Sequence, residues 1–268
     1  MSISGASGHG SVADSHSLVE QIRHYWNTRI HDLEMAKSPT GSAAFFEELD
    51  AYRYEKLNYL PHSVDFGGYR GRRVLEIGCG IGTDLVRFAR GGALVTGVDV
   101  SQAAIDLARR NFECAGLPAE LRVADGCWLP YAGGHFDLVY CHGVLQYAAD
   151  PGGMVREAHR VLARKGTAIF MVYNRRSWLA WMSRNLGVQL EHSDAPAFQL
   201  FTIAEFDALL AIFPRRQIVP ERFPVRSRLH GGLKGALYNR AFVQAFQLLP
   251  RDWVRRFGWH LMAFCSKE

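Results

Sequence analysis

The sequence predicts an α/β protein whose core is a doubly wound, mostly parallel sheet of seven strands. Between residues 73 and 265, apolar runs of strand length alternate with segments whose apolar residues recur at helical spacing. The apolar run VLEI stops at the closely spaced Gly78, Gly80 and Gly82, and a helical pattern begins directly after them. A second run, ALVTGVDVS, closes on an aspartate. Because strands that alternate with helices favour parallel pairing, helices are expected on both faces of the sheet.

Two helices are expected before the sheet. Residues 1–16 are small and polar and lack the charged and apolar regions of a signal peptide, so we expect a disordered tail. Residues 17–35 have apolar positions at helical spacing, and the Ser-Pro-Thr-Gly run at 38–41 breaks this pattern. A second helix is expected from 42 to about 57, since its aromatic residues fall on or near one face. The sheet-forming part begins near residue 70.

The strands and helices of the sheet then follow in alternation. The expected strands span residues 73–77, 94–99, 119–124, 136–141, 167–173, 216–224 and 258–265. The expected helices between them span residues 82–90, 101–115, 150–163 and 201–212. Residues 226–256 are longer than a strand connection needs, and their apolar residues have helical spacing. Because residues 214–257 carry ten Lys or Arg against one Asp and one Glu, this is the basic part of the chain.

Composition favours a globular protein and disfavours several other classes. A length of 268 residues fits one domain with additions, and 48% hydrophobic residues is ordinary for a buried core. No apolar run is long enough to span a membrane. The five cysteines show no Cys-x-x-Cys spacing, which fits a reducing cytoplasm and argues against zinc or a disulfide framework. The net charge of +5 is too mild to imply nucleic acid.

The glycine loop and Asp99 predict a nucleoside-bearing ligand. In a doubly wound sheet, ligands bind at the carboxyl ends of the strands, near the point where the strand order reverses. Gly78, Gly80 and Gly82 let the backbone turn sharply there and lie close to a ligand. Asp99 ends the second strand and can accept hydrogen bonds from two ribose hydroxyls. The alternative is that Asp99 merely caps the helix that opens near Ser101.

Charge indicates which ligand the loop accepts. Glu76 lies two residues before the first glycine and Asp84 two residues after the last. Carboxylates at these positions would repel the pyrophosphate of a dinucleotide, whose loops usually read G-x-G-x-x-G rather than G-x-G-x-G. They suit a ligand with cationic groups, such as the ammonium and sulfonium of S-adenosylmethionine.

These motifs carry a family resemblance. With the glycine loop, Asp99, the Ala-Asp-Gly run at 124–126 and FDLVYCHGVLQY at 136–147, the chain resembles class I S-adenosylmethionine-dependent methyltransferases. It is similar to the small-molecule enzymes of ubiquinone and menaquinone biosynthesis, and the resemblance covers residues 70–175 well. It implies a Rossmann-like fold with an antiparallel last strand.

The resemblance also implies a domain plan and an activity. A helical lid over the cofactor (residues 17–69) would precede a methyltransferase domain (residues 70–268), with 226–256 as a helical insertion. The activity would be methyl transfer to a small organic acceptor, such as a secondary metabolite, quinone or lipid-like compound. S-adenosylhomocysteine would be the second product, and no metal would be needed because the sequence shows no acidic pair or His cluster.

The resemblance implies a cofactor site at the strand ends, closed by side chains from the N-terminal helices. Its expected residues are Tyr25, Arg53, Glu76, Gly78, Gly80, Gly82, Asp99, Val100, Asp125, Gly126, Cys141 and Gln146. Asp125 would accept from the adenine amine, or it could instead form an Asx turn with Gly126. Glu76 would order water or the ammonium end of the cofactor, and an aromatic residue or Arg53 would meet its carboxylate.

His142 and Tyr173 are the expected catalytic residues. His142 follows the fourth strand, where a neutral imidazole could remove a proton from a hydroxyl or ammonium acceptor. Alternatively, it hydrogen-bonds a backbone carbonyl at the strand end. Many relatives have a His four residues later, where this chain has Gln146, so their base assignment does not transfer. Tyr173 ends the fifth strand and could bind the acceptor or simply pack at the rim.

The sequence also bears on other functions. Enzymes that methylate base amines carry an Asn/Asp-Pro-Pro-aromatic loop after the fourth strand, where this chain reads CHGV, so nucleic acid is not an expected partner. The basic, aromatic segment 226–256 could lie on an anionic membrane and serve a lipidic acceptor, or it could be a substrate lid. Another group transfer from the same cofactor, such as aminocarboxypropyl transfer, stays open. The acceptor atom and the oligomeric state are not predicted.

Overall fold

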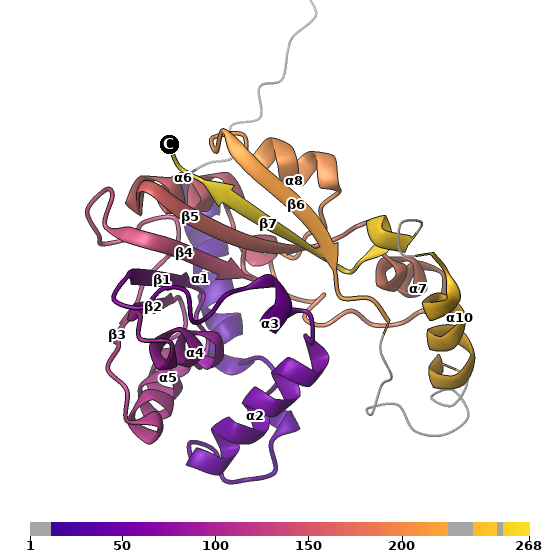
Figure 1. The fold of residues 1–268 in the computed structure, drawn as a ribbon, viewed down its shortest axis with the longest axis horizontal. Helices are drawn as coiled ribbons and strands as arrows, with labels where there is room; N and C mark the ends of the chain where they lie inside the picture. Colours follow the sequence, from indigo (N-terminus) through magenta and orange to yellow (C-terminus); the bar gives the residue numbers. More distant parts are fainter. Residues whose placement is uncertain (1–11, 225–237, 251–253) are drawn as a thin grey trace, which may run out of the picture.

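The computed structural model describes residues 12–224, 238–250 and 254–268, which form a seven-stranded sheet with helices on both faces (Figure 1). Its order is β3-β2-β1-β4-β5-β7-β6, and β7 runs antiparallel to both of its neighbours. This confirms the doubly wound, mostly parallel sheet with an antiparallel last strand. The strands are β1 (Arg73–Ile77), β2 (Leu94–Asp99), β3 (Glu120–Val123), β4 (Phe136–His142), β5 (Leu162–Tyr173), β6 (Arg215–Glu221) and β7 (His260–Ser266).

Helices connect the strands and cover the sheet. They are α1 (Val12–Thr28), α2 (Ala43–Lys56), α3 (Leu60–Ser63), α4 (Thr83–Arg90), α5 (Gln102–Ala115), α6 (Pro151–Val161), α7 (Trp178–Leu186), α8 (Ile203–Leu209) and α10 (Val243–Leu248). Short helical turns are η1 (Leu33–Met35), η2 (Leu145–Tyr147), η3 (Tyr238–Phe242) and η4 (Arg255–Phe257). Helices α2, α5, α6, α7 and α8 begin after a residue whose side chain accepts a backbone N–H, which typically stabilises a helix by about 1 kcal/mol: Ser42, Ser101, Asp150, Ser177 and Thr202.

The strand order reverses between β1 and β4. After β1 the chain adds β2 and β3 on one side, and it then crosses to place β4 on the other side of β1. Ile77, Asp99, His142 and Tyr173 end β1, β2, β4 and β5 at the same edge. This is the edge at which doubly wound sheets bind ligands.

Apolar residues on both faces of the sheet hold this edge in place. Leu75 and Ile77 pack in the buried cluster on one face, whereas Val74 packs in the cluster on the other. A third cluster places Phe45 and Phe46 of α2 against Ile81, next to the glycines. Packing therefore fixes α2 on the loop that follows β1.

The first helix differs from its predicted span of 17–35. It begins at Val12, since no glycine or proline follows Gly10 to stop it, and residues 1–11 of the predicted tail lie outside the described residues. It ends at Thr28, whose hydroxyl donates to the carbonyls of His24 and Tyr25 at 3.1 and 3.0 Å. Side chains that bond to the backbone in this way compete with continuation of a helix.

Two regions after β5 were not fully anticipated. Helix α7 follows Ser177 in a stretch for which no helix was predicted. It lies beside η3 and α10 (Figure 1), and the rings of Trp178 and of Phe242 in η3 are 6.0 Å apart. The predicted helical insertion 226–256 falls partly outside the described residues; its described part consists of η3, α10 and η4.

Candidate active site

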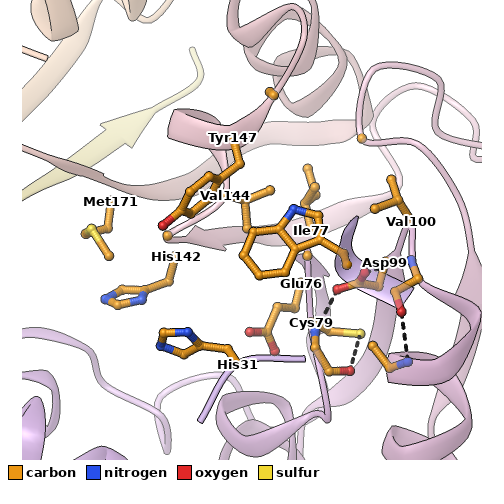
Figure 2. A pocket seen from close by; sticks show the side chains of 18 of the residues that line it. His31, Glu76, Ile77, Cys79, Asp99, Val100, His142, Val144, Tyr147 and Met171 are labelled. Atoms are coloured by element: carbon orange, nitrogen blue, oxygen red, sulfur yellow. Dashed lines mark hydrogen bonds between the residues drawn. The ribbon is translucent and has the colours of Figure 1, made fainter. Parts of the chain in front are cut away.

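A cavity of about 820 Å³ opens at the carboxyl edge of the sheet and reaches under α1 and α2. Its volume is in the upper part of the usual range for ligand cavities, roughly 300–1,000 Å³. Figure 2 shows Asp99 and Val100 toward one end, Glu76 in the middle, and His142 and Met171 toward the other end. The cavity therefore has room for a cofactor and a second molecule.

The glycine loop forms the floor of one end. Gly78, Gly80 and Gly82 have φ values of 69°, 53° and 78°, which L side chains rarely adopt. A Cβ on Gly78 would lie 2.3 Å from Cγ2 of Val144, so this position has no space for a side chain. Gly78 and Gly80 line the cavity, whereas Gly82 lies outside the described lining and precedes α4.

Asp99 is fixed by its own neighbours. Its Oδ1 accepts the N–H of Ser101 and its Oδ2 accepts the N–H of Gly80, both at 2.9 Å. The helix cap is Ser101, whose hydroxyl accepts from Ala104 at 3.1 Å, so capping does not use the carboxylate of Asp99. Each carboxylate oxygen has a second acceptor position. The arrangement leaves Asp99 able to accept from a vicinal diol.

The two carboxylates beside the loop have different partners. Asp84 accepts from Arg53 Nε at 2.7 Å and also from the hydroxyls of Tyr54 and Tyr140 at 2.8 and 2.9 Å. Its acceptor positions are therefore occupied. Glu76 is 4% exposed, and its Oε2 has no hydrogen-bond partner in the described part of the chain.

Of the two carboxylates beside the glycine loop, Glu76 is therefore the one that can still accept a hydrogen bond from a ligand. Burial, with the negative charge of Asp84 nearby, raises the pKa of Glu76 well above its usual value. A buried carboxyl oxygen without a partner is costly, and a ligand cation beside it would favour the ionised form. The residues present thus fit the cationic end of S-adenosylmethionine, with Glu76 rather than Asp84 available to it.

Asp125, Gly126 and Val100 also line the cavity. Asp125 Oδ1 accepts the N–H of Cys127 at 2.8 Å, which closes an Asx turn across Gly126. The turn uses one of the four acceptor positions of the carboxylate. Both sequence-based interpretations of Asp125, the turn and the ligand contact, are compatible with this geometry.

Three further predicted cofactor residues lie outside the described lining of the cavity. The hydroxyl of Tyr25 donates to Asp194 at 2.8 Å. Cys141 is fully buried within β4. Gln146 is fully buried in η2, and neither its Oε1 nor its Nε2 has a partner among the described residues. Arg53 does line the cavity, but its guanidinium is engaged by Asp84.

His142 contacts side chains at both ring nitrogens. Arg53 Nη2 lies 3.3 Å from its Nδ1, and the hydroxyl of Tyr59 lies 2.9 Å from its Nε2. Burial and the charge of Arg53 lower the pKa of His142 to about 3, so the imidazole is neutral at physiological pH. This pKa lies well below that of an ordinary imidazole.

Tyr173 lines the cavity from the end of β5. Its ring stacks on Trp259 at a centroid distance of 4.5 Å and on His260 at 5.5 Å. Burial, together with the negative charge of Glu191, raises the pKa of Tyr173 to about 12. The phenol is therefore protonated and available as a donor at neutral pH.

Sequence reasoning missed a charged group of residues at the far end of the cavity. Lys56 Nζ lies 3.1 Å from Asp32 and 3.0 Å from Glu191, and His31 lies 3.1 Å from Asp32. Burial opposes ionisation of Glu191, but Lys56 and Arg222 outweigh it and lower its pKa to about 2. The sequence contains only weak signals of charged residues at this end of the cavity. His260 begins the largely apolar strand β7, and Arg222 directly follows β6.

Two features are absent from the part of the chain that the structure describes. None of the helices in ranges 12–224, 238–250 and 254–268 has the length and apolar character to cross a membrane. In the same ranges, no group of three or more His, Cys, Asp or Glu is placed to hold a metal ion. All five cysteines are free thiols.

Comparison with known proteins adds family information. Residues 75–170 match the family model of a methyltransferase domain. The chain is 30% identical over 120 residues to a ubiquinone biosynthesis O-methyltransferase of Coxiella burnetii, covering 45% of this chain and 50% of that protein. It is 28% identical over 205 residues to the protein of the same name from Bordetella avium, covering 72% and 76%. The chain thus spans about half the length of the first of these relatives.

Solved structures resemble the chain in fold. A S-adenosylmethionine-dependent methyltransferase from Thermotoga maritima, described as a possible histamine N-methyltransferase, gives a TM-score of 0.61 at 16% identity, covering 92% of this chain and all of that one. Magnesium protoporphyrin IX methyltransferase from Synechocystis, with bound S-adenosylhomocysteine, gives 0.57 at 15% identity, covering 92% and 98%. At such identities the likeness shows the Rossmann-like fold alone.

Proposed function

We propose that the chain is a class I S-adenosylmethionine-dependent methyltransferase and that it transfers a methyl group to a small organic acceptor. One observation carries the proposal. A single cavity of about 820 Å³ is lined by both Glu76, whose buried Oε2 has no hydrogen-bond partner among the described residues, and the fixed carboxylate of Asp99. The relatives named for ubiquinone biosynthesis support an acceptor of the quinone, secondary-metabolite or lipid-like kind.

We propose that the cofactor occupies the end of the cavity beside β1 and β2. Asp99 would accept from the ribose hydroxyls, Asp125 from the adenine amine, and Glu76 from the ammonium group. The backbone of Gly78 and Gly80 would lie against the methionine part. When bound, S-adenosylmethionine supplies a methyl group that its sulfonium has already activated.

The remaining task of the protein is to position the acceptor and exclude water. Trp26, Tyr147 and Met171 line the cavity, with the rings of Trp26 and Tyr147 5.0 Å apart, and would hold an apolar or aromatic molecule. Alignment of two reactants in one site can supply most of the acceleration. Tyr173, a protonated donor, would orient the acceptor through a hydrogen bond.

His142 is proposed as the base for a hydroxyl acceptor. It is neutral, and it lies at the end of β4 on the side of the cavity away from Asp99, where the acceptor is proposed to bind (Figure 2). Since Arg53 Nη2 lies 3.3 Å from Nδ1, the contact with Arg53 must open before that nitrogen takes a proton. An acceptor that arrives already deprotonated would need no base.

Calorimetry tests the proposed function. We expect S-adenosylmethionine and S-adenosylhomocysteine to bind with micromolar dissociation constants, and NAD to bind negligibly. The reason is that Glu76 favours a cationic ligand and disfavours a pyrophosphate. Tighter binding of NAD than of S-adenosylhomocysteine would contradict the proposal.

We also propose that the surface formed by α7, α10 and η4 makes weak contact with anionic membranes. Apolar side chains are exposed on these elements together with arginines, a combination suited to the interface of a charged bilayer. The exposed residues are Trp181, Arg184, Leu186, Leu248, Leu249, Arg255, Arg256 and Phe257. A membrane-bound acceptor could then reach the cavity.

A further inference from the structure

Three hydrogen-bonding groups lie in line between two arginines at the far end of the cavity. Arg53 Nη2 is 3.3 Å from His142 Nδ1, and His142 Nε2 is 2.9 Å from the hydroxyl of Tyr59. The same hydroxyl is 2.6 Å from His260 Nδ1, and His260 Nε2 is 3.2 Å from Arg222 Nη1. The line therefore contains four contacts and has a guanidinium at each end.

The protons in this line exceed the contacts that can use them. Neutral His142, Tyr59 and His260 each have one hydrogen to donate. Only two of the four contacts, His142–Tyr59 and Tyr59–His260, offer an acceptor for one of these hydrogens. A guanidinium only donates, so it cannot accept the third proton. Burial and the charge of Arg222 lower the pKa of His260 well below its usual value, so this ring is neutral too. One N–H consequently faces an arginine.

The distances assign the surplus proton to His260. A contact of 2.6 Å between Tyr59 and His260 suits an O–H donor, and 2.9 Å between His142 and Tyr59 suits an N–H donor. Tyr59 then donates to Nδ1 of His260, and His142 donates to Tyr59. The other acceptor near the Tyr59 hydroxyl, the thioether of Met262 at 3.9 Å, is a weak one. The proton on Nε2 of His260 is left pointing at Arg222.

Arg222 also has donor capacity to spare. Its side chain is 15% exposed, and Glu191 Oε1 lies 3.6 Å from its Nη2, while the same oxygen is 3.0 Å from Lys56. The backbone of Arg222 is held in place, because its carbonyl accepts from Trp178 Nε1 at 3.0 Å and its φ is 56°. Two donors, Arg222 Nη1 and His260 Nε2, thus converge in the cavity lining without an acceptor between them among the described residues.

We propose that Arg222 and His260 bind a carboxylate of the methyl acceptor, so that the substrate is an aromatic carboxylic acid. One oxygen between the two groups would accept from both, and the guanidinium fork matches a carboxylate. The aromatic class follows from the neighbouring rings of Tyr147 and Tyr173, which line the same end. This inference rests on the proposed function.

The methionine part of the cofactor also carries a carboxylate, so the two sources must be separated. Position favours the acceptor. His260 begins β7, and Asp99 ends β2, four strands away in the sheet order β2-β1-β4-β5-β7. At the usual strand spacing this is about 19 Å across the sheet. The donor pair therefore lies at the end of the cavity opposite to the ribose position.

The test uses benzoate and its neutral isostere benzamide as probes of the protein saturated with S-adenosylhomocysteine. Ligand-detected NMR titration should give benzoate an affinity at least about tenfold higher than that of benzamide, because the amide has no negative charge and replaces one of the two accepting oxygens with a donor. Arg222→Gln should abolish this preference. Arg215→Gln, an exposed arginine at the other end of β6, should leave it unchanged.

Equal affinities of the two probes for the native protein would overturn the proposal without any variant. A preference for benzoate that survives in R222Q would overturn it as well. If R222Q loses affinity for S-adenosylhomocysteine and keeps the benzoate preference, the donor pair serves the cofactor, which also overturns it. Failure of the native protein to bind S-adenosylhomocysteine would instead refute the proposed function, and the probes would then be compared on the protein alone.

Discussion

Asp99 is the single residue on which the proposed cofactor site depends most. D99A removes the acceptor for the ribose hydroxyls and leaves the N–H groups of Gly80 and Ser101 without their present partner. Because a hydrogen bond to a charged group contributes about 1.5–3 kcal/mol, we expect D99A to bind S-adenosylhomocysteine at least about tenfold more weakly in calorimetry. D106A, which removes an exposed carboxylate on α5, should bind normally. Equal affinities of D99A and the native protein would contradict the proposed contact between Asp99 and the ribose.

His142 and His260 link stability to pH. Their folded pKa values are lowered, to about 3 for His142, so the unfolded chain takes up protons below pH about 6.5 while the folded protein does not. Stability should therefore be fully present above pH 7 and fall as the pH drops from about 6.5 toward 3. Each imidazole would contribute at most about 1.4 kcal/mol per pH unit.

Thermal unfolding between pH 7 and 4 measures this effect. H142N should show a shallower loss of melting temperature with falling pH than the native protein, whereas H62N, at an exposed histidine on α3, should not. An identical slope for H142N would contradict the neutral state assigned to His142. The same state predicts that turnover shows no titration of His142 near pH 6.5.

Local sequence was sufficient for some site residues and insufficient for others. The glycine loop and Asp99 lie within 22 residues of chain, and their roles depend on backbone that the same strands form. Glu191 follows β5, Arg222 follows β6 and His260 begins β7. Only tertiary packing brings these three residues together. Likewise, the sequence placed Glu76 and Asp84 beside the loop but could not show that Asp84 is already ion-paired with Arg53.

At the scale of elements, the ion pair between α2 and α4 is the strongest contact to test. Arg53 and Asp84 are 21% and 1% exposed, whereas the similarly bonded Arg87 and Asp50 are 32% and 28% exposed. Arg53→Gln leaves a buried carboxylate without its cation, and we expect a loss of about 3 kcal/mol or more in denaturant unfolding. Arg87→Gln should cost at most about 1 kcal/mol. Similar losses in the two variants would show that burial does not govern these pairs.

The N-terminal helices are proposed to close over the ligands. Val19, Ile22 and Trp26 of α1 line the cavity, and α1 is joined to α5 by Asn27, which accepts from the Ser101 hydroxyl at 3.1 Å. We expect amide hydrogen exchange in residues 17–60 to slow when S-adenosylhomocysteine binds, because the ligand would disfavour opening of these helices. Residues 203–209 of α8, which contribute nothing to the described lining of the cavity, are the internal reference. Unchanged exchange in 17–60 would mean fixed packing rather than a lid.

The sheet was predictable because its strands are apolar runs bounded by turn residues, and the parallel order follows from the helices between them. The end of α1 was not, since it depends on the side-chain bonds of Thr28 and on contact with α5. Helix α7 was missed because its apolar and polar residues mix. Several of them are exposed, and Trp178 contacts Phe242 of η3, which is distant in the sequence.

For the whole molecule, the surface of α7, α10 and η4 predicts salt-sensitive membrane binding. Native protein should co-sediment with phosphatidylglycerol vesicles at low salt and be released at high salt, because screening shortens the reach of its arginines. Phosphatidylcholine vesicles should bind less. W181S should weaken the association by removing an exposed indole from α7. Binding that is indifferent to salt and lipid charge would contradict this contact.

The position of β7 between β5 and β6 has a consequence for biosynthesis. β6 is synthesised before β7, yet in the described sheet it is hydrogen-bonded to β7 and to no other strand. During translation the backbone groups of β5 that pair with β7, and those of β6, therefore lack their strand partner until residues 260–266 have been synthesised. His260 arrives in the same step, so the nascent chain completes its sheet and its carboxylate-binding pair at the same moment.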